Sequence, residues 1–177
     1  IDRYYAELQR LNTGTALTLL KGYAQLVANL RDPGDAPWRL EGRYVDDENR
    51  LADACQEDGT GFCSLLTIRL MLRYRFGRLD DALATLEQLE PRAEAIRATL
   101  VNVERHFYGA LTRIAAYPRQ SGAARWDMRS RIRKHLGLFR HWAEASPANF
   151  WHKNKLLEAE WFRVNDHDRD AIKAYEE

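Results

Sequence analysis

The sequence has few cysteines, few prolines and no long hydrophobic run, and each shortage excludes a class of protein. Two cysteines, Cys55 and Cys63, are too few for a disulfide scaffold or a cysteine-only zinc site. No apolar run approaches the roughly 20 residues that a membrane-spanning helix needs, so no span is predicted. Neither charge sign dominates, since 27 Lys and Arg accompany 26 Asp and Glu, and no global field recruits nucleic acid or a membrane surface. The composition indicates a soluble, compact protein, which we expect in the cytoplasm.

The rest of the composition is that of an ordinary globular protein. Hydrophobic residues make up 45% and charged residues 30% of the 177 residues, a length that suits one domain or one stretch of a repeat array. No basic and apolar leader follows Ile1, and residues 170–177 have a helical pattern without a capping glycine or proline. We therefore expect residues 1–177 to be a single helical-repeat segment of a longer multidomain chain.

Helical periodicity is present along almost the whole chain, and no segment alternates long enough with period two to predict a strand. In residues 15–30, apolar residues recur at steps of four and three, at Ala16, Leu20, Tyr23, Val27 and Leu30. Residues 31–45 contain two prolines and two glycines and are predicted as a loop. The expected helices are 4–11, 15–30, 46–57, 62–76, 80–89, 100–117, 123–145, 156–164 and 169–177. The fold class is predicted to be all-α, with 62–76 buried because it is apolar nearly all round.

Two helix-turn-helix segments match the pattern of tetratricopeptide repeats, in which two helices pair around a small-residue turn. In the first, Gly77 forms the turn, Ala82 follows five residues later and Pro91 closes the unit. In the second, Asp166 stands where glycine is usual; the small and aromatic positions are Ala159, Phe162, Ala171 and Tyr175. The turns are 89 positions apart, which is no multiple of the roughly 34-residue repeat. We predict an irregular α-solenoid of tetratricopeptide-like antiparallel helix pairs, with an unrelated helical bundle as the alternative.

One stretch of the chain resembles a known family. Residues 147–160, PANFWHKNKLLEAE, are similar to a P-x-N-F-x-H-K-x-x-L-x-E-A-E signature of the helical region of large multi-sensor signalling kinases. In those proteins a serine/threonine-kinase-like domain and a P-loop ATPase precede this region, and sensor modules with a histidine kinase often follow it. The resemblance implies that the kinase and ATPase active sites lie outside these residues. It also implies that the partners are neighbouring kinase, ATPase or sensor domains, or another protein.

Motifs for chemistry are scarce, and each has a simpler structural interpretation. Residues 58–61 (DGTG) lack the order of a phosphate loop and the strand before it, which favours a turn between helices. His167 lies between two aspartates without a second histidine nearby, which favours a turn over a metal site. Cys55 and Cys63 are expected to be free thiols rather than a redox pair. No nucleophile elbow or carboxylate pair is evident, so we predict no catalytic, cofactor-binding or metal-ligating residue and no enzyme activity for this segment.

Basic residues are concentrated between residues 119 and 141. Seven of them accompany a single acid, Asp127: Arg119, Arg125, Arg129, Arg131, Arg133, Lys134 and Arg140. The buried side of the same helix is predicted to hold Leu136, Leu138, Phe139 and Trp142. This basic stripe suits an acidic protein surface or, less well, a nucleic-acid backbone. The alternative is a solvated face paired with acids elsewhere, such as Asp46, Asp47, Glu48 and Glu57.

The candidate protein-docking residues come from the basic stripe and from the signature: Arg129, Arg133, Arg140, Trp151, His152 and Lys153. Trp151 and Trp161 bracket the signature and are expected to pack in the core more readily than to form a recognition surface. The sequence therefore predicts a non-catalytic scaffold in a signal-transduction kinase with an ATPase module. The alternative is a free-standing helical nucleic-acid-binding regulator that uses residues 119–141.

Overall fold

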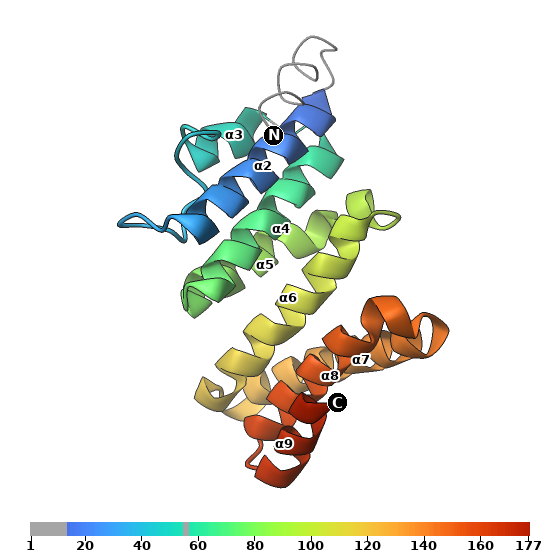
Figure 1. Ribbon diagram of the computed structural model, residues 1–177. Coiled ribbons are helices and arrows are strands. Elements are labelled where there is room, and N and C mark those ends of the chain that lie inside the picture. The colour runs from blue at the N-terminus through green and yellow to red at the C-terminus, as the bar shows by residue number, and fades with distance from the viewer. Residues whose placement is uncertain (1–13, 55–56) are drawn as a thin grey trace. The chain divides into compact units, whose positions relative to one another are not determined.

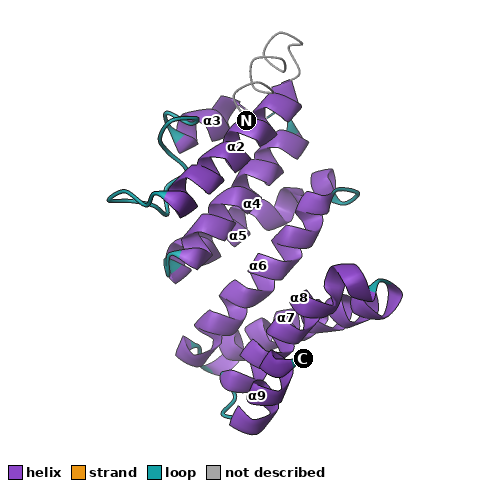
Figure 2. Cartoon of the chain, in the orientation of Figure 1, coloured by secondary structure: helices purple, strands orange, loops and turns teal. Residues whose placement is uncertain are grey.

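The computed structural model describes residues 14–54 and 57–177, and every regular element within these ranges is helical (Figures 1 and 2). In chain order they are α2 (Gly14–Arg31), α3 (Glu48–Ala54), α4 (Gly59–Arg75), α5 (Leu79–Leu89), the 3-10 helix η1 (Glu90–Ile96), α6 (Leu100–Ala116), η2 (Tyr117–Arg119), α7 (Gly122–Ala145), α8 (Pro147–Arg163) and α9 (Asp168–Glu176). The all-α prediction is confirmed. The helix expected at 4–11 and Cys55 lie outside the described residues. No helix in the described part is both long enough and apolar enough to cross a lipid bilayer.

The chain divides into two compact units, residues 1–105 and 106–177, with the division inside α6. In the first unit α4 is the central helix, packing against α2, α5 and η1. Residues 63–72 of α4 are all buried, as its apolar circumference predicts. Ala82 on α5, the small residue of the first tetratricopeptide-like match, has no exposed surface.

Helices α2 and α4 lie side by side and run in the same direction (Figure 1). At their starts, the Thr15 hydroxyl donates a 2.6 Å hydrogen bond to Asp58 Oδ2. Farther along both helices, a Cβ atom placed on Gly22 would come within 2.7 Å of Ile68 Cδ1. Parallel neighbours need a returning connection, and residues 32–58, which include α3, supply it. The starts of α4, α6 and α8, at residues 59, 100 and 147, are separated by 41 and 47 positions.

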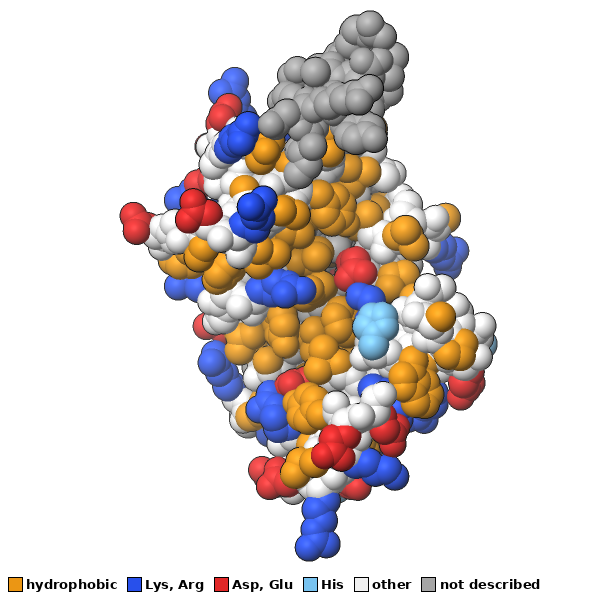
Figure 3. Space-filling model, viewed as in Figure 1, with side chains coloured by type: hydrophobic (Ala, Val, Ile, Leu, Met, Phe, Trp, Pro, Cys, Tyr) orange, Lys and Arg blue, Asp and Glu red, His pale blue; other side chains and the backbone are white. Residues whose placement is uncertain are grey.

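The buried face of α2 differs from the apolar stripe in its sequence. Val27 and Leu30 of that stripe are each 42% exposed, and hydrophobic side chains appear on the surface of this unit in Figure 3. The buried residues of α2 include the polar Gln25 and Asn29 instead. Periodicity therefore identified the helix but not the side that packs.

Gln25 and Asn29 are buried because they hold the loop after α2. The backbone amide of Tyr44 donates to Gln25 Oε1 over 2.8 Å, and Gln25 Nε2 donates to the carbonyl of Glu41 over 2.9 Å. Asn29 Nδ2 donates to the carbonyl of Arg39. These bonds satisfy loop peptide groups that have no helical or strand partner, so the predicted loop has a fixed course.

The second unit is built on an aromatic chain between α6, α7 and α8. Ring centroids are 5.8 Å apart for Phe107 and Phe139, 5.1 Å for Phe139 and Trp142, and 5.4 Å for Trp142 and Phe150. Phe139 has no exposed surface. Helix α7 packs on α8, and α8 packs on α9.

Helix α8 begins well before the start that the sequence predicts. We expected a helix over 156–164, whereas α8 covers Pro147–Arg163. Ser146 precedes it, and proline suits the first helical turn because its missing N–H needs no partner there. The expectation was wrong because residues 147–155 lack a clear apolar stripe: only Asn154 among them is buried.

The turns after α4 and after α8 have the same backbone geometry. Gly77 has a φ of 71° and Asp166 a φ of 60°, both in the left-handed region. In each turn the amide of the next residue donates to the carbonyl five positions earlier, over 2.8 Å in the first and 3.1 Å in the second. This bond is the signature of a Schellman ending. Asp166 thus occupies the backbone position at which the sequence pattern expected glycine.

Candidate docking surface on helix α7

One side of α7 anchors it in the second unit and the other side faces solvent. Ile132, Phe139 and Ala143 are buried on the anchored side, and Leu136, Leu138 and Trp142 are half-buried beside them. Of the four residues predicted on the buried side, Phe139 is fully buried and the other three are half-buried. Most of the remaining residues of α7 are exposed, and they include the basic stripe.

Five residues on the solvent side of α7 line a shallow depression of about 360 Å³: Trp126, Arg129, Ser130, Arg133 and Lys134. We call them the α7 surface. They share one side of the helix because their spacings of three, four, seven and eight match its turns. Trp126 is 74% exposed. Within the part of the chain that the structure describes, the three basic side chains have no hydrogen-bond or ion-pair partner.

Other basic residues of the stripe have partners nearby. Arg131 pairs with Asp127 over 2.8 Å, one turn away on the same helix. Arg140 lies 3.4 Å from Glu158 on α8, and the Arg125 guanidinium lies 4.1 Å from the centre of the Tyr117 ring. Of the predicted docking residues on α7, Arg129 and Arg133 therefore share one surface, whereas Arg140 is paired with another helix.

The acids suggested as partners for the stripe include Glu48, which has a different role. Glu48 Oε1 accepts hydrogen bonds from Arg69 and Arg73, each over 3.1 Å, and Oε2 accepts one from the backbone amide of Leu40 over 2.9 Å. Glu48 is only 5% exposed, and burial lowers the pKa of Arg69. Pairing of Glu48 with the basic stripe is thus contradicted, because its carboxylate is buried within the first unit.

The three docking candidates on α8 lie in different environments. The Lys153 ammonium lies 4.2 Å from the centre of the Phe107 ring, so its side chain covers the aromatic chain. His152 is exposed. Trp151 is 43% exposed, with the Lys155 ammonium 4.6 Å from its ring centre. The expectation that Trp151 packs in the core was wrong.

Three other signature residues pack within the second unit. Phe150 belongs to the aromatic chain, and Leu157 and Ala159 have no exposed surface. Trp161 does pack as expected, with its ring centroid 5.0 Å from that of Tyr117. The signature thus supplies buried contacts for α8, and its exposed residues are 147–149, Trp151, His152 and Leu156.

Sequence reasoning missed a polar cluster between α6 and α7. His106 Nδ1 lies 3.1 Å from His135 Nδ1, and an Arg113 guanidinium nitrogen lies 3.4 Å from His135 Nε2. A guanidinium can only donate, so Nε2 of His135 accepts and its Nδ1 donates to His106. This contact joins the two helices. The histidines are 29 positions apart, with no local pattern to connect them.

The other motifs have structural roles. Asp58 caps α4, where its Oδ1 accepts the Gly61 amide over 3.0 Å, so the DGTG segment begins a helix. His167 precedes α9, and no group of three or more potential metal ligands occurs in 14–54 or 57–177. Cys63 is a free thiol whose Sγ lies 3.2 Å from the Arg92 carbonyl, and burial raises its pKa.

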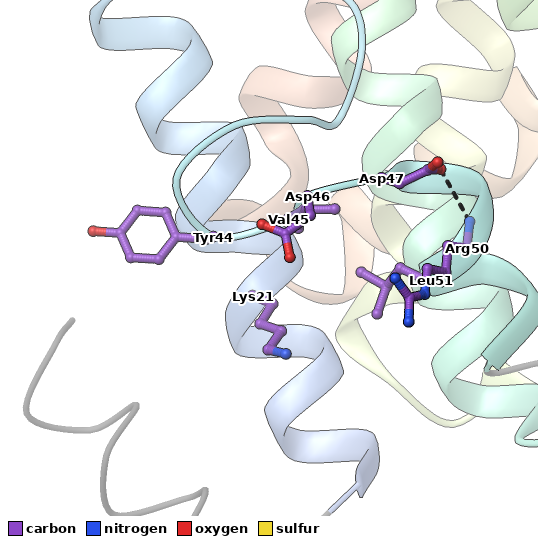
Figure 4. Close-up of a pocket in the computed structure, with 7 residues that line it drawn as sticks. All are labelled: Lys21, Tyr44, Val45, Asp46, Asp47, Arg50 and Leu51. Carbon is purple, nitrogen blue, oxygen red and sulfur yellow. Dashed lines mark hydrogen bonds between the residues drawn. The ribbon is translucent and has the colours of Figure 1, made fainter.

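A second depression, of about 270 Å³, lies in the first unit among α2, the loop and α3 (Figure 4). Its lining carries two cations, Lys21 and Arg50, and two acids, Asp46 and Asp47. Asp47 Oδ1 accepts the backbone amide of Arg50 over 3.1 Å. With its charges balanced, this depression has no preference for a charged ligand, unlike the α7 surface with three cations and no acid.

Comparisons with protein-family models, curated proteins and solved structures found no match to this chain. The kinase resemblance of residues 147–160 therefore depends on the sequence alone.

Proposed function

We propose that this chain is a non-catalytic scaffold segment that mediates contacts with protein partners or with neighbouring domains of a signalling kinase. The observation that carries the proposal is the α7 surface. It places an exposed tryptophan beside three basic side chains that have no partner among the described residues, on a helix whose other side is anchored in a core. Tryptophan and arginine dominate the residues that supply binding energy at protein interfaces.

The helical architecture supports a scaffold role. The alternate helices α4, α6 and α8 begin 41 and 47 positions apart, and two hairpins share one turn geometry. Arrays of stacked helix pairs bury a continuous core and present extended surfaces, so a partner can alter the orientation of attached domains. The recurrence is longer than the roughly 34 residues of a tetratricopeptide repeat, so the array we propose is irregular.

The kinase setting of the proposal depends on residues 147–160, and the size of the native polypeptide tests it. An immunoblot of source cells with an antibody to this chain should show a band several times larger than 20.6 kDa. A band near that mass would overturn the kinase setting. ATP hydrolysis by the purified chain, absent in the proposal, would overturn the non-catalytic role.

Nucleic-acid binding is the second candidate function, and the grouping of Arg129, Arg133 and Lys134 on one surface favours it. Its test is salt. Phosphate contacts release counterions, so affinity for an oligonucleotide should fall steeply as ionic strength rises. Binding that persists at high salt would exclude this candidate.

A further inference from the structure

We propose that the α7 surface binds a short acidic protein segment that carries an apolar anchor residue. The inference rests on the proposed scaffold function and names the class of partner. It follows from the charge, the length and the exposed aromatic ring of this surface.

The positive charge of the α7 surface requires a negatively charged partner. Arg129, Arg133 and Lys134 line one depression and have no partner among the described residues. The nearest acid in sequence, Asp127, is held by Arg131 over 2.8 Å. Carboxylates brought by a partner would meet two guanidinium groups that can each form paired hydrogen bonds.

Length limits the size of the partner. From Trp126 to Lys134 the helix rises about 12 Å, which corresponds to about four residues of an extended strand or two turns of a helix. A short segment therefore covers the whole surface. At one end the Trp126 ring, 74% exposed, offers an apolar face against which a leucine or phenylalanine can pack.

The same observations favour a protein segment over a nucleic acid. A phosphate backbone is usually bound by a strongly basic face, whereas this chain has a net charge of +1. Other cations of the stripe, Arg131 and Arg140, are paired with acids, so phosphates would also meet Asp127 and Glu158. The three cations of the α7 surface match a few carboxylates.

Fluorescence anisotropy with the full chain tests the inference. The probe is a set of labelled twelve-residue peptides with four glutamates around a leucine-phenylalanine pair placed at different positions. Matched peptides carry glutamines in place of the glutamates, and a labelled single-stranded twelve-nucleotide thymidine oligomer represents nucleic acid. The surface variants are R129Q/R133Q and W126A. Their controls are R131Q/R140Q, which removes the same charge from the same helix, and W151A, which removes an exposed tryptophan from α8.

We expect at least one acidic peptide to bind about tenfold more tightly than its glutamine counterpart. R129Q/R133Q and W126A should each weaken that binding about tenfold, and both controls should leave it unchanged. The inference is overturned if no acidic peptide binds better than its counterpart, or if the controls weaken binding as much as the surface variants. Tighter, salt-sensitive binding of the oligomer than of every peptide would also overturn it, in favour of nucleic acid.

The experiments distinguish failure of the peptide-binding inference from failure of the proposed scaffold function. A large native polypeptide with no ATP hydrolysis keeps the scaffold role even if every peptide fails. Circular dichroism of each variant shows whether its helices are intact; all the substituted side chains are exposed, so we expect no loss of helix.

Discussion

The hairpins α4–α5 and α8–α9 have the same turn but different surroundings. Both turns place one residue in the left-handed region and close with the same backbone bond. Helix α4 is buried over 63–72, whereas only Asn154, Leu157 and Ala159 are buried in α8. The two hairpins thus share a turn geometry but differ in how much of their first helix is buried.

The ion pairs made by α4 and α8 differ in the same way. In the first unit, Glu48 joins Arg69 and Arg73, all largely removed from solvent. In the second unit, the α8 carboxylates of Glu158 and Glu160 pair with arginines that are more than half exposed. Buried pairs are costly to break, and exposed pairs contribute little. We infer that the Glu48 pairs stabilise the first unit, whereas the exposed pairs of α8 add little to the stability of the second.

Replacing Glu48 with glutamine should have the largest effect on stability. E48Q leaves Arg69 and Arg73 without their carboxylate inside the first unit, and breaking a buried pair in this way costs about 3–5 kcal/mol. Urea denaturation followed by circular dichroism measures the loss.

The matched control is E158Q, which removes a carboxylate that pairs with the exposed Arg140 and with Lys155. It should cost less than about 1 kcal/mol. Equal losses for E48Q and E158Q would mean that burial does not separate the two units in the way we infer.

Replacing Gly77 with alanine should have the next largest effect. A Cβ atom on Gly77 meets nothing within 4 Å, so the cost arises only from its φ of 71°. We expect G77A to lower the free energy of unfolding by about 1–2 kcal/mol.

Gly137 on α7 is its control, since a Cβ there also meets nothing within 4 Å and no positive φ occurs. In a helix interior, alanine is favoured over glycine, so G137A should stabilise by about 0.5–1 kcal/mol. Thermal unfolding of the two variants should shift in opposite directions. A destabilised G137A would indicate a packing role for that position.

The sequence was a good guide wherever a local pattern decides the outcome. The buried helix α4, the Gly77 turn and the inner side of α7 all followed from periodicity and turn chemistry. So did the matching position of Asp166, although its residue type departs from the pattern. Local patterns predicted these features because neighbours in the chain determine them.

The sequence was a poor guide wherever distant residues meet. The buried side of α2 was not its apolar stripe, because Gln25 and Asn29 bind loop carbonyls. Glu48 was one of four acids suggested as alternative partners of the basic stripe, but its partners are on α4. The docking candidates were only partly grouped: Arg129 and Arg133 lie together, yet Trp126, the most exposed tryptophan beside them, was not selected. Composition and spacing do not predict whether a single aromatic residue is exposed to solvent.

The helix starts offer a smaller, pH-dependent contrast between the units. Asp58 caps α4 with its side chain, whereas Ser146 before α8 makes no side-chain cap. Removing an aspartate cap costs about 1 kcal/mol, so D58A should destabilise by about that amount near pH 7. S146A should have little effect, and urea denaturation compares the two.

The cost of D58A should also vanish in acid. The Thr15 hydroxyl and the Gly61 amide, which donate to the carboxylate, lower the pKa of Asp58 below its ordinary value of 3.8. A lowered pKa in the folded state means that the carboxylate stabilises the fold above the ordinary value, and that this contribution is lost as pH falls through the folded value. The difference between wild type and D58A should therefore be constant from pH 7 to about pH 5 and shrink below about pH 4. A pH-independent difference would mean that the charge of Asp58 is not what caps α4.

The smallest effect should come from making the second turn identical to the first. Asp166 has a φ of 60°, where side chains are strained, although aspartate tolerates the region better than most residues. Glycine removes this strain but loses more chain entropy on folding, so D166G should stabilise by only about 0.5 kcal/mol. Thermal unfolding at matched concentration measures the shift, and D168G, at the first position of α9, is the control because glycine is unfavourable in a helix. A stabilised D166G with a destabilised D168G would show that the turn after α8 uses the left-handed position as the turn after α4 does. If D166G is destabilised instead, the aspartate side chain stabilises the turn after α8. The two hairpins would then have the same turn conformation, stabilised by a side chain in one and by glycine in the other.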